Sequence, residues 1–129
     1  MPTGKRTAEE RAMLIGLSLE VTYDLGFSLQ ERAALHGINE DVGQNPEYLY
    51  RELVELGKGD NVEERCEELL VLHALLAKVG CRNPASKREF VERERYQCLS
   101  GMTFKEWLAK CTSIVDIRHA TEQLRYMST

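Results

Sequence analysis

Three histidines and four cysteines are the side chains of this 129-residue chain that could support acid–base catalysis, nucleophilic catalysis or metal binding. They are His36, His73, His119, Cys66, Cys81, Cys98 and Cys111. The cysteines are all 13 or more positions apart, whereas metal knuckles and redox motifs need close pairs. The histidines have no partner at ligand spacing, and His73 lies in an apolar segment typical of a core histidine. Since the chain also lacks a Gly-rich phosphate-binding loop, we predict a protein that is not an enzyme, with no catalytic residue, no metal and no cofactor.

A second group of side chains has the chemistry of a protein–protein contact. Met102, Phe104 and Trp107 follow a glycine bend at the start of a short predicted helix. Aromatic and Met side chains are enriched at the centres of protein interfaces, so we predict a partner-binding surface here. Trp107 has a second interpretation, as an anchor of the core. Arg118 and Arg125 lie on the polar side of the last predicted helix, where they face solvent or a partner.

A third group could contact DNA. Ala33 followed by Gly37 matches the small residue and the turn glycine of a helix-turn-helix, whose second helix enters the major groove. The residues nearby that could reach phosphates or bases are Gln44, Asn45, Tyr48, Tyr50 and Arg51. The loop between the two helices is longer than the three or four residues that this motif uses.

The charge balance opposes contact with nucleic acid and with anionic lipid. The chain has 17 Lys and Arg against 21 Asp and Glu, a formal net charge of −4. Residues 39–68 hold ten acidic and three basic side chains, a net charge of −7, so the rest of the chain carries +3. DNA binding gains affinity from counterion release by Lys and Arg, and this segment lacks them. A further possibility is that segment 39–68 acts as a DNA-like decoy that binds a regulator.

Helices are predicted to position all of these groups, because apolar residues recur at intervals of three and four and alternating runs are missing. Capping pairs predict the helix starts, and glycines at 26, 37, 57 and 80 predict ends. The pairs are Thr7 with Glu10, Ser28 with Glu31, Asn61 with Glu64, Ser86 with Glu89, Thr103 with Glu106, and Ser113 with Asp116. The helices are expected at 7–25, 28–36, 45–56, 61–79, 86–99, 103–111 and 113–127. The fold class is all-α, a compact bundle of about seven helices with 61–79 at its centre.

Length and hydropathy limit the organisation of the chain. With 129 residues and 43% hydrophobic side chains, we expect one all-helical domain over 1–129, with a degenerate helix-turn-helix region at 7–60 and a partner-binding region at 61–129. No apolar run is long enough to span a bilayer and the N-terminus has no apolar signal core, so we expect a cytoplasmic protein. Exposed apolar stripes at this size favour a homodimer.

The last third of the chain resembles a known family. The segment Leu99-Ser100-Gly101-Met102-Thr103-Phe104-Lys105-Glu106-Trp107-Leu108 is similar to the toxin-binding domain of Xre/MbcA/ParS antitoxins. Residues 64–70, at the start of a leucine-rich helix, resemble the family's preceding helix, and residues 25–38 resemble the first half of its Xre-like helix-turn-helix. The resemblance implies that the chain terminus, with Arg125, Tyr126 and Met127, enters or covers the cleft of a RES-type toxin that consumes NAD+.

Three hypotheses follow for the function. The first is an antitoxin-like protein of a toxin–antitoxin system that binds and occludes a partner protein, which the resemblance implies is such a toxin. The second is an Xre-type DNA-binding transcriptional repressor. The third is the regulator-binding decoy that uses the acidic segment.

Overall fold

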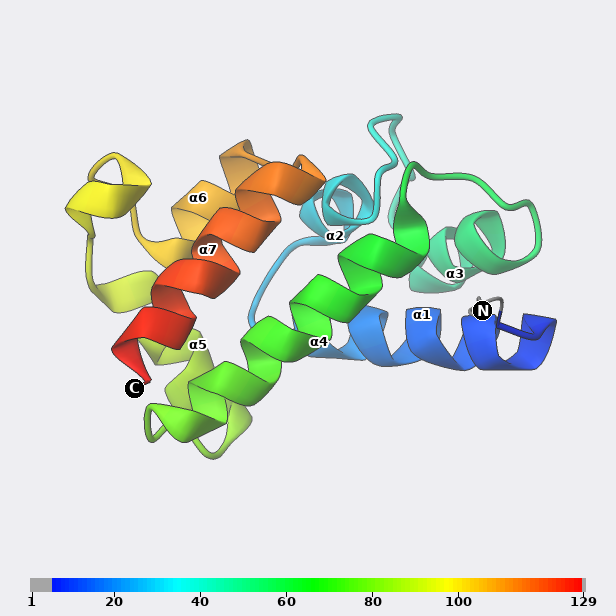
Figure 1. The fold of residues 1–129 in the computed structure, drawn as a ribbon. Coiled ribbons are helices and arrows are strands. Elements are labelled where there is room, and N and C mark those ends of the chain that lie inside the picture. Colours follow the sequence, from blue (N-terminus) through cyan, green and yellow to red (C-terminus); the bar gives the residue numbers. More distant parts are fainter. Residues whose placement is uncertain (1–5, 129) are drawn as a thin grey trace.

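This computed structural model describes residues 6–128 of the chain. They contain seven α-helices and one short 3₁₀ helix, joined by loops (Figure 1). They are α1 (Ala8–Asp24), α2 (Leu29–Leu35), α3 (Pro46–Val54), α4 (Val62–Lys78), α5 (Pro84–Arg93), the 3₁₀ helix η1 (Gln97–Leu99), α6 (Phe104–Lys110) and α7 (Ile114–Met127). The all-α class is therefore confirmed, with no strand within residues 6–128. Residues 1–5 and Thr129, which the expected domain includes, lie outside the described residues. Within 6–128, every helix is too short or too polar to cross a membrane.

Local capping signals set most of the helix ends. The predicted capping boxes at Thr7, Ser28 and Thr103 are present, and in each the glutamate three residues on completes the second hydrogen bond. Ser113 caps α7 by accepting from the backbone N–H three residues on. Asn61 makes no side-chain cap hydrogen bond and has a φ of 52°, so the cap predicted there is wrong.

The helix predicted at 86–99 has different limits in the structure, where α5 spans Pro84–Arg93. It begins earlier, because the Asn83 side chain accepts from the N–H of Ser86 (2.8 Å) and Pro84 occupies the first turn. The Oγ of Ser86 accepts in return from the Asn83 N–H (3.3 Å), so the box expected between Ser86 and Glu89 does not form. The helix also ends earlier, because Glu94 has extended backbone angles.

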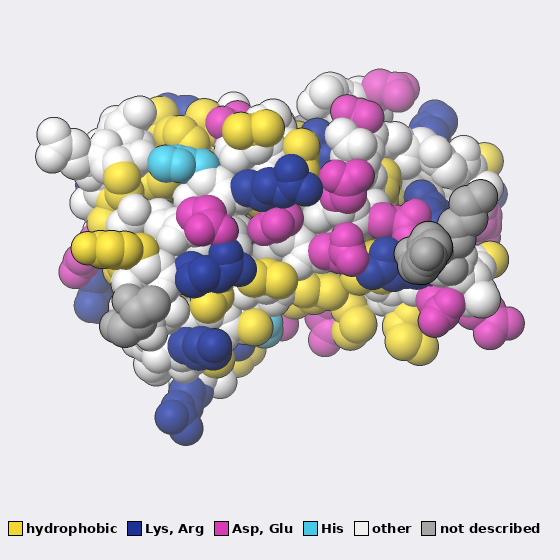
Figure 2. Space-filling model, in the orientation of Figure 1, with side chains coloured by type: hydrophobic (Ala, Val, Ile, Leu, Met, Phe, Trp, Pro, Cys, Tyr) yellow, Lys and Arg dark blue, Asp and Glu magenta, His cyan; other side chains and the backbone are white. Residues whose placement is uncertain are grey.

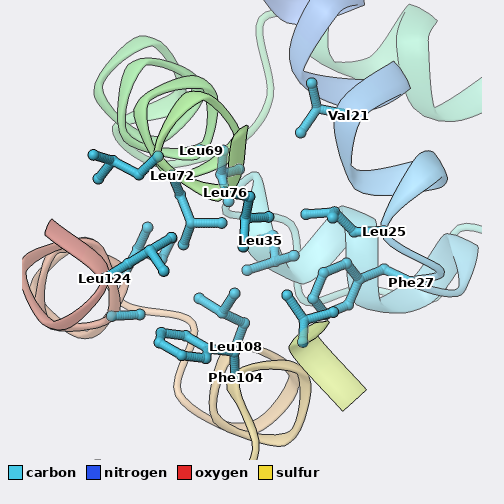
Figure 3. Close-up of a cluster of buried hydrophobic side chains, with 14 of the residues drawn as sticks. Val21, Leu25, Phe27, Leu35, Leu69, Leu72, Leu76, Phe104, Leu108 and Leu124 are labelled. Carbon is cyan, nitrogen blue, oxygen red and sulfur yellow. The ribbon is translucent and has the colours of Figure 1, made fainter. Parts of the chain in front are cut away.

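Helix α4 lies at the centre of the bundle, as its all-round apolar sequence predicts, and packs against both α1 and α7 (Figure 1). Leu69, Leu72 and Leu76 of α4 enter the larger core cluster, together with side chains from both ends of the sequence (Figure 3). Val62 and Cys66, nearer the start of α4, enter a smaller cluster with residues of α1, α2 and α3. Because α4 contributes to both clusters, the regions 7–60 and 61–129 share their hydrophobic cores.

The connection after α2 differs from a helix-turn-helix turn. Residues 36–45 separate α2 from α3, so the tight turn of that motif is absent. Gly37 has a φ of 88°, and a Cβ on it would lie 2.4 Å from the backbone nitrogen of Asp60. This glycine therefore allows the loop before α4 to pass directly against the end of α2.

Arg65 of α4 links distant parts of the chain through backbone carbonyls. Its Nε donates to the carbonyl of Asp60 (2.6 Å), and its Nη1 donates to the carbonyls of Leu35 (3.3 Å) and Thr112. Leu35 is the last residue of α2, and Thr112 lies between α6 and α7. This buried guanidinium thus satisfies carbonyls that a helix end and a loop leave unpaired.

Candidate protein-binding site

A loop that reverses the direction of the chain between Tyr96 and Met102 positions Met102 and the start of α6. The N–H of Tyr96 donates to the carbonyl of Met102 (3.1 Å), which closes the loop around η1. Gly101 has a φ of 80° and provides the predicted bend, while Ser100, with a φ of 57°, is a second left-handed residue. Thr103 then caps α6, so Met102 lies partly exposed on a fixed turn.

Phe104 is placed differently from the prediction. Its side chain is 1% exposed, and its ring centroid lies 5.2 Å from that of Tyr96 and 6.0 Å from that of Phe90. Figure 3 shows it in the larger core beside Leu108 and Leu124. The first residue of α6 faces the core, so Phe104 cannot contact a partner in this fold and belongs to the packing.

Trp107 combines the two roles predicted for it. It packs against the larger core cluster and is partly exposed. Its indole Nε1–H donates to the carbonyl of Asp116 in α7 (2.9 Å), and its ring lies 5.3 Å from the ring of His119. The Nε2 of His119 lies 2.8 Å from the carbonyl of Cys98. Trp107 and His119 are therefore held as one aromatic ledge between α6 and α7.

The exposed side of α7 continues from this ledge. Val115 is 68% exposed and Tyr126 is 77% exposed, and the residues between them at helical spacing are exposed as well. We call this set, with Trp107, the α7 surface: Val115, Arg118, His119, Glu122, Arg125 and Tyr126. Sequence reasoning missed Val115 and His119, although their spacing of four residues on an amphipathic helix was visible.

Arg118 and Arg125, the two arginines predicted to contact a partner, both form ion pairs within the chain. Arg118 lies 3.4 Å from Glu64 and 3.5 Å from Glu68 of α4, and Arg125 pairs with Glu122 one turn earlier. Figure 2 shows basic and acidic side chains next to each other across this face. Met127, the last residue of α7, is partly buried against the larger cluster. The apolar and aromatic part of the α7 surface is therefore bordered by neutralised charges.

Arginines from outside segment 39–68 also neutralise much of its negative charge. Glu63 and Glu67 pair with Arg6 at 3.1 and 2.6 Å, and Arg11 lies 3.7 Å from Glu63. Together with the pairs of Arg118, these contacts cover four of the ten acids. The decoy hypothesis loses support, because a DNA-like surface needs these carboxylates free.

The residues predicted for DNA contact lie along the start and outer side of α3. The side chain of Asn45 accepts from the N–H of Glu47 (3.0 Å) as the helix cap, while Gln44, Tyr48 and Tyr50 are exposed. Arg51, the one basic residue of α3, lies 3.3 Å from Glu55. This helix offers aromatic hydroxyls and acids to solvent, and the guanidinium that could meet a phosphate is paired.

A buried polar chain surrounds His36. The histidine is fully buried, its Nδ1 lies 2.6 Å from the carbonyl of Arg32, and its Nε2 lies 2.7 Å from the Oγ of Ser18. Because a carbonyl can only accept, Nδ1 carries the proton and Nε2 accepts from the hydroxyl. Burial lowers the pKa of His36 to about 4, and burial raises the pKa of the Cys66 thiol to about 11. The hydrogen bond between Ser18 and His36 joins α1 to the end of α2, and both residues and Cys66 of α4 are closed to solvent.

The remaining histidine and a small pocket lie near α5. Lys87 donates to the Nε2 of His73 (3.0 Å), and burial lowers the pKa of that histidine. A pocket of about 230 Å³ is lined by Cys81, Ser86, Glu89, Phe90, Arg93 and Glu94. Burial raises the pKa of the Cys81 thiol in its wall. Among residues 6–128, no group of three or more His, Cys, Asp or Glu side chains could hold a metal ion.

The fold and this surface define a small all-helical protein with a partly exposed aromatic ledge next to the exposed side of its last helix. Comparisons with protein-family models, with curated proteins and with solved structures found no match.

Proposed function

We propose that this chain is an antitoxin-like binding protein, which attaches to another protein through the α7 surface and covers its functional site. The observation that carries this proposal is the Trp107–His119 ledge, an aromatic pair fixed by hydrogen bonds in which Trp107 is partly exposed and His119 is exposed, one helical turn after the exposed Val115. A fixed aromatic side chain loses little conformational entropy on binding, so it can contribute a large share of the affinity.

The surroundings of the ledge also support a binding role. The pairs of Arg118 with Glu64 and Glu68 flank the ledge with polar groups, as a polar rim flanks the apolar centre of an interface. The other apolar residues of the surface, Val115 and Tyr126, lie on one continuous helix. A rigid helix face can therefore dock without a large rearrangement of this chain.

The kind of partner that we propose is based on the resemblance to Xre/MbcA/ParS antitoxins. In that interpretation the partner is a RES-type toxin that consumes NAD+, and the end of α7, including Arg125, Tyr126 and Met127, covers its cleft. A cytoplasmic location and a homodimer are parts of the same proposal. Native mass spectrometry of the purified chain checks the homodimer.

Co-expression tests the proposal directly. A RES-type reading frame next to the gene of this chain is expressed in bacteria, and wild-type chain is expected to restore growth. Val115→Lys combined with Tyr126→Ala is expected to lower the surviving colony count at least about tenfold, since both side chains lie on the proposed contact. Circular dichroism and immunoblotting confirm that the variants are folded and present.

A matched control separates a contact from a general surface effect. Leu56→Lys makes the same type of change as Val115→Lys at another exposed apolar residue, which follows α3. This variant is expected to protect as well as wild type. If no adjacent reading frame is relieved, or if Leu56→Lys loses as much protection as Val115→Lys combined with Tyr126→Ala, the proposal is wrong.

A further inference from the structure

A second exposed apolar surface lies on α1, at the other end of the molecule from α7 (Figure 1). Met13 is 69% exposed and Leu17 is 49% exposed, and their spacing of four residues puts them on one side of the helix. The ring of Tyr50 from α3 lies beside Gly16, since a Cβ on Gly16 would be 3.9 Å from its Cε2, and Gly16 follows Met13 by three residues on the helix. Two helices thus form one apolar strip of Met13, Leu17 and Tyr50, which we call the α1–α3 strip.

Among residues 6–128, the charged side chains that share a helix side with this strip are acidic. Glu9 precedes Met13 by four residues, Glu20 follows Leu17 by three, and Glu47 precedes Tyr50 by three, so each lies on the same helix side as the strip. All three are exposed, and none makes an ion pair within residues 6–128. Figure 2 shows apolar side chains over α1 with acidic ones beside them at the lower right edge.

The nearest basic side chains do not neutralise this rim. Arg11 of α1 is directed to the other side, where it contacts Glu63 at 3.7 Å and donates to the carbonyl of Leu53 (3.0 Å). Arg51 of α3 is paired with Glu55. The acids around the α1–α3 strip therefore differ from those of α4, whose partners come from within the chain.

We propose that the α1–α3 strip is a docking site for a basic amphipathic helix of another protein. The partner's apolar side would cover Met13, Leu17 and Tyr50, and its Lys or Arg side chains would meet Glu9, Glu20 and Glu47. Charge complementarity selects this occupant: a second copy would set acids against acids, and an anionic membrane or DNA would be repelled. The inference is independent of the function proposed for α7.

Fluorescence anisotropy with a defined peptide tests this assignment. The probe is a labelled peptide of about 18 residues with leucines along one helical side and lysines along its flanks, at low salt. Met13→Ser with Leu17→Ser is expected to weaken its binding at least about tenfold. Glu20→Lys with Glu47→Lys is expected to do the same, with an effect that shrinks as salt rises.

Matched controls exclude non-specific attraction of a cation to an acidic protein. Glu40→Lys changes the charge of another exposed acid, in the loop before α3, and is expected to change the affinity less than about twofold. A peptide with glutamates in place of the lysines, and one with the same composition but no amphipathic side, are expected not to bind. Equal losses for Glu40→Lys and for Glu20→Lys with Glu47→Lys would overturn the proposal.

Two other occupants are outcomes of the same experiment. If native mass spectrometry finds a dimer that Met13→Ser with Leu17→Ser dissociates, the strip is a self-interface and the proposal is wrong. If wild-type chain binds vesicles of phosphatidylglycerol while the basic peptide fails to bind, the strip contacts lipid and the proposal is equally wrong.

Discussion

Acid pH is expected to destabilise this protein through His36. The imidazole is fully buried and neutral in the folded chain, with a pKa lowered to about 4 from the ordinary value of 6.5. Its neighbours add no compensating anion, because Arg32 and Arg65 both oppose a positive charge there and Ser18 is neutral. The unfolded chain therefore binds a proton at His36 that the folded chain excludes.

The sign and size of the effect follow from the two pKa values. The stabilisation by neutral His36 is complete above pH 6.5 and is lost as the pH falls from 6.5 towards 4, since the unfolded state takes up protons in that window. At 1.36 kcal/mol per pKa unit, the loss is of the order of 3 kcal/mol. That is a large part of the stability of a typical domain, which is about 5–15 kcal/mol, so a clearly lower urea midpoint is expected near pH 4.5 than at pH 7.5.

Urea denaturation between pH 7.5 and 4.5 measures this loss, with Trp107 fluorescence and circular dichroism as probes. His36→Gln is the control, because it keeps hydrogen-bonding groups and removes the titration. The variant is expected to be less stable at pH 7.5 but to show a flatter pH profile between 6.5 and 4.5. The other ionisable groups are common to the two proteins, so their contributions cancel in the comparison. Parallel profiles for the two proteins would refute the reasoning.

Three further predictions concern single positions and α3. Gly37→Ala is expected to cost more than about 2 kcal/mol in chemical denaturation, because it adds a clash with Asp60 to the strain of a positive φ, whereas Gly57→Ala meets no atom within 4 Å and should cost about 1 kcal/mol. Equal costs would mean that the close approach is unimportant. Thr103→Ala is expected to cost about 1 kcal/mol through the lost cap of α6, with Thr112→Ala nearly neutral in the same melts. In a gel shift with promoter DNA at low salt, micromolar protein is expected to produce no shifted band, and a band that weakens steeply with salt would contradict this.

Much of the fold could be predicted because helix ends depend on neighbours in the sequence. Thr7, Ser28 and Thr103 each meet their glutamate three residues on, so a local pattern determines the hydrogen bonds. The error at 86–99 is also local in origin. Two start signals compete there, and Asn83 with Pro84 prevails over Ser86 with Glu89, since Pro cannot donate and suits the first turn.

The candidate site was less predictable, because it depends on contacts between residues far apart in the sequence. In the sequence Phe104 resembles an interface residue, but in the fold it packs against the rings of Phe90 and Tyr96. Trp107 is part of the ledge because its indole N–H donates to the carbonyl of Asp116 and its ring lies against His119, both on another helix. Periodicity shows which side of α7 is polar but not which neighbouring helix neutralises that side.

Charge shows the same limit most clearly, and it connects the two proposed surfaces. The sequence places a net charge of −7 in residues 39–68. In the folded chain the acids of α4 lie against Arg6, Arg11 and Arg118, which come from the N-terminal segment, α1 and α7. Such exposed pairs add little stability, but they cancel the local field along α4. Among residues 6–128, negative charge without an ion pair therefore remains beside the α1–α3 strip, while the α7 surface has a nearly neutral rim. The two surfaces are thus expected to select partners of different charge, one basic and one mainly apolar.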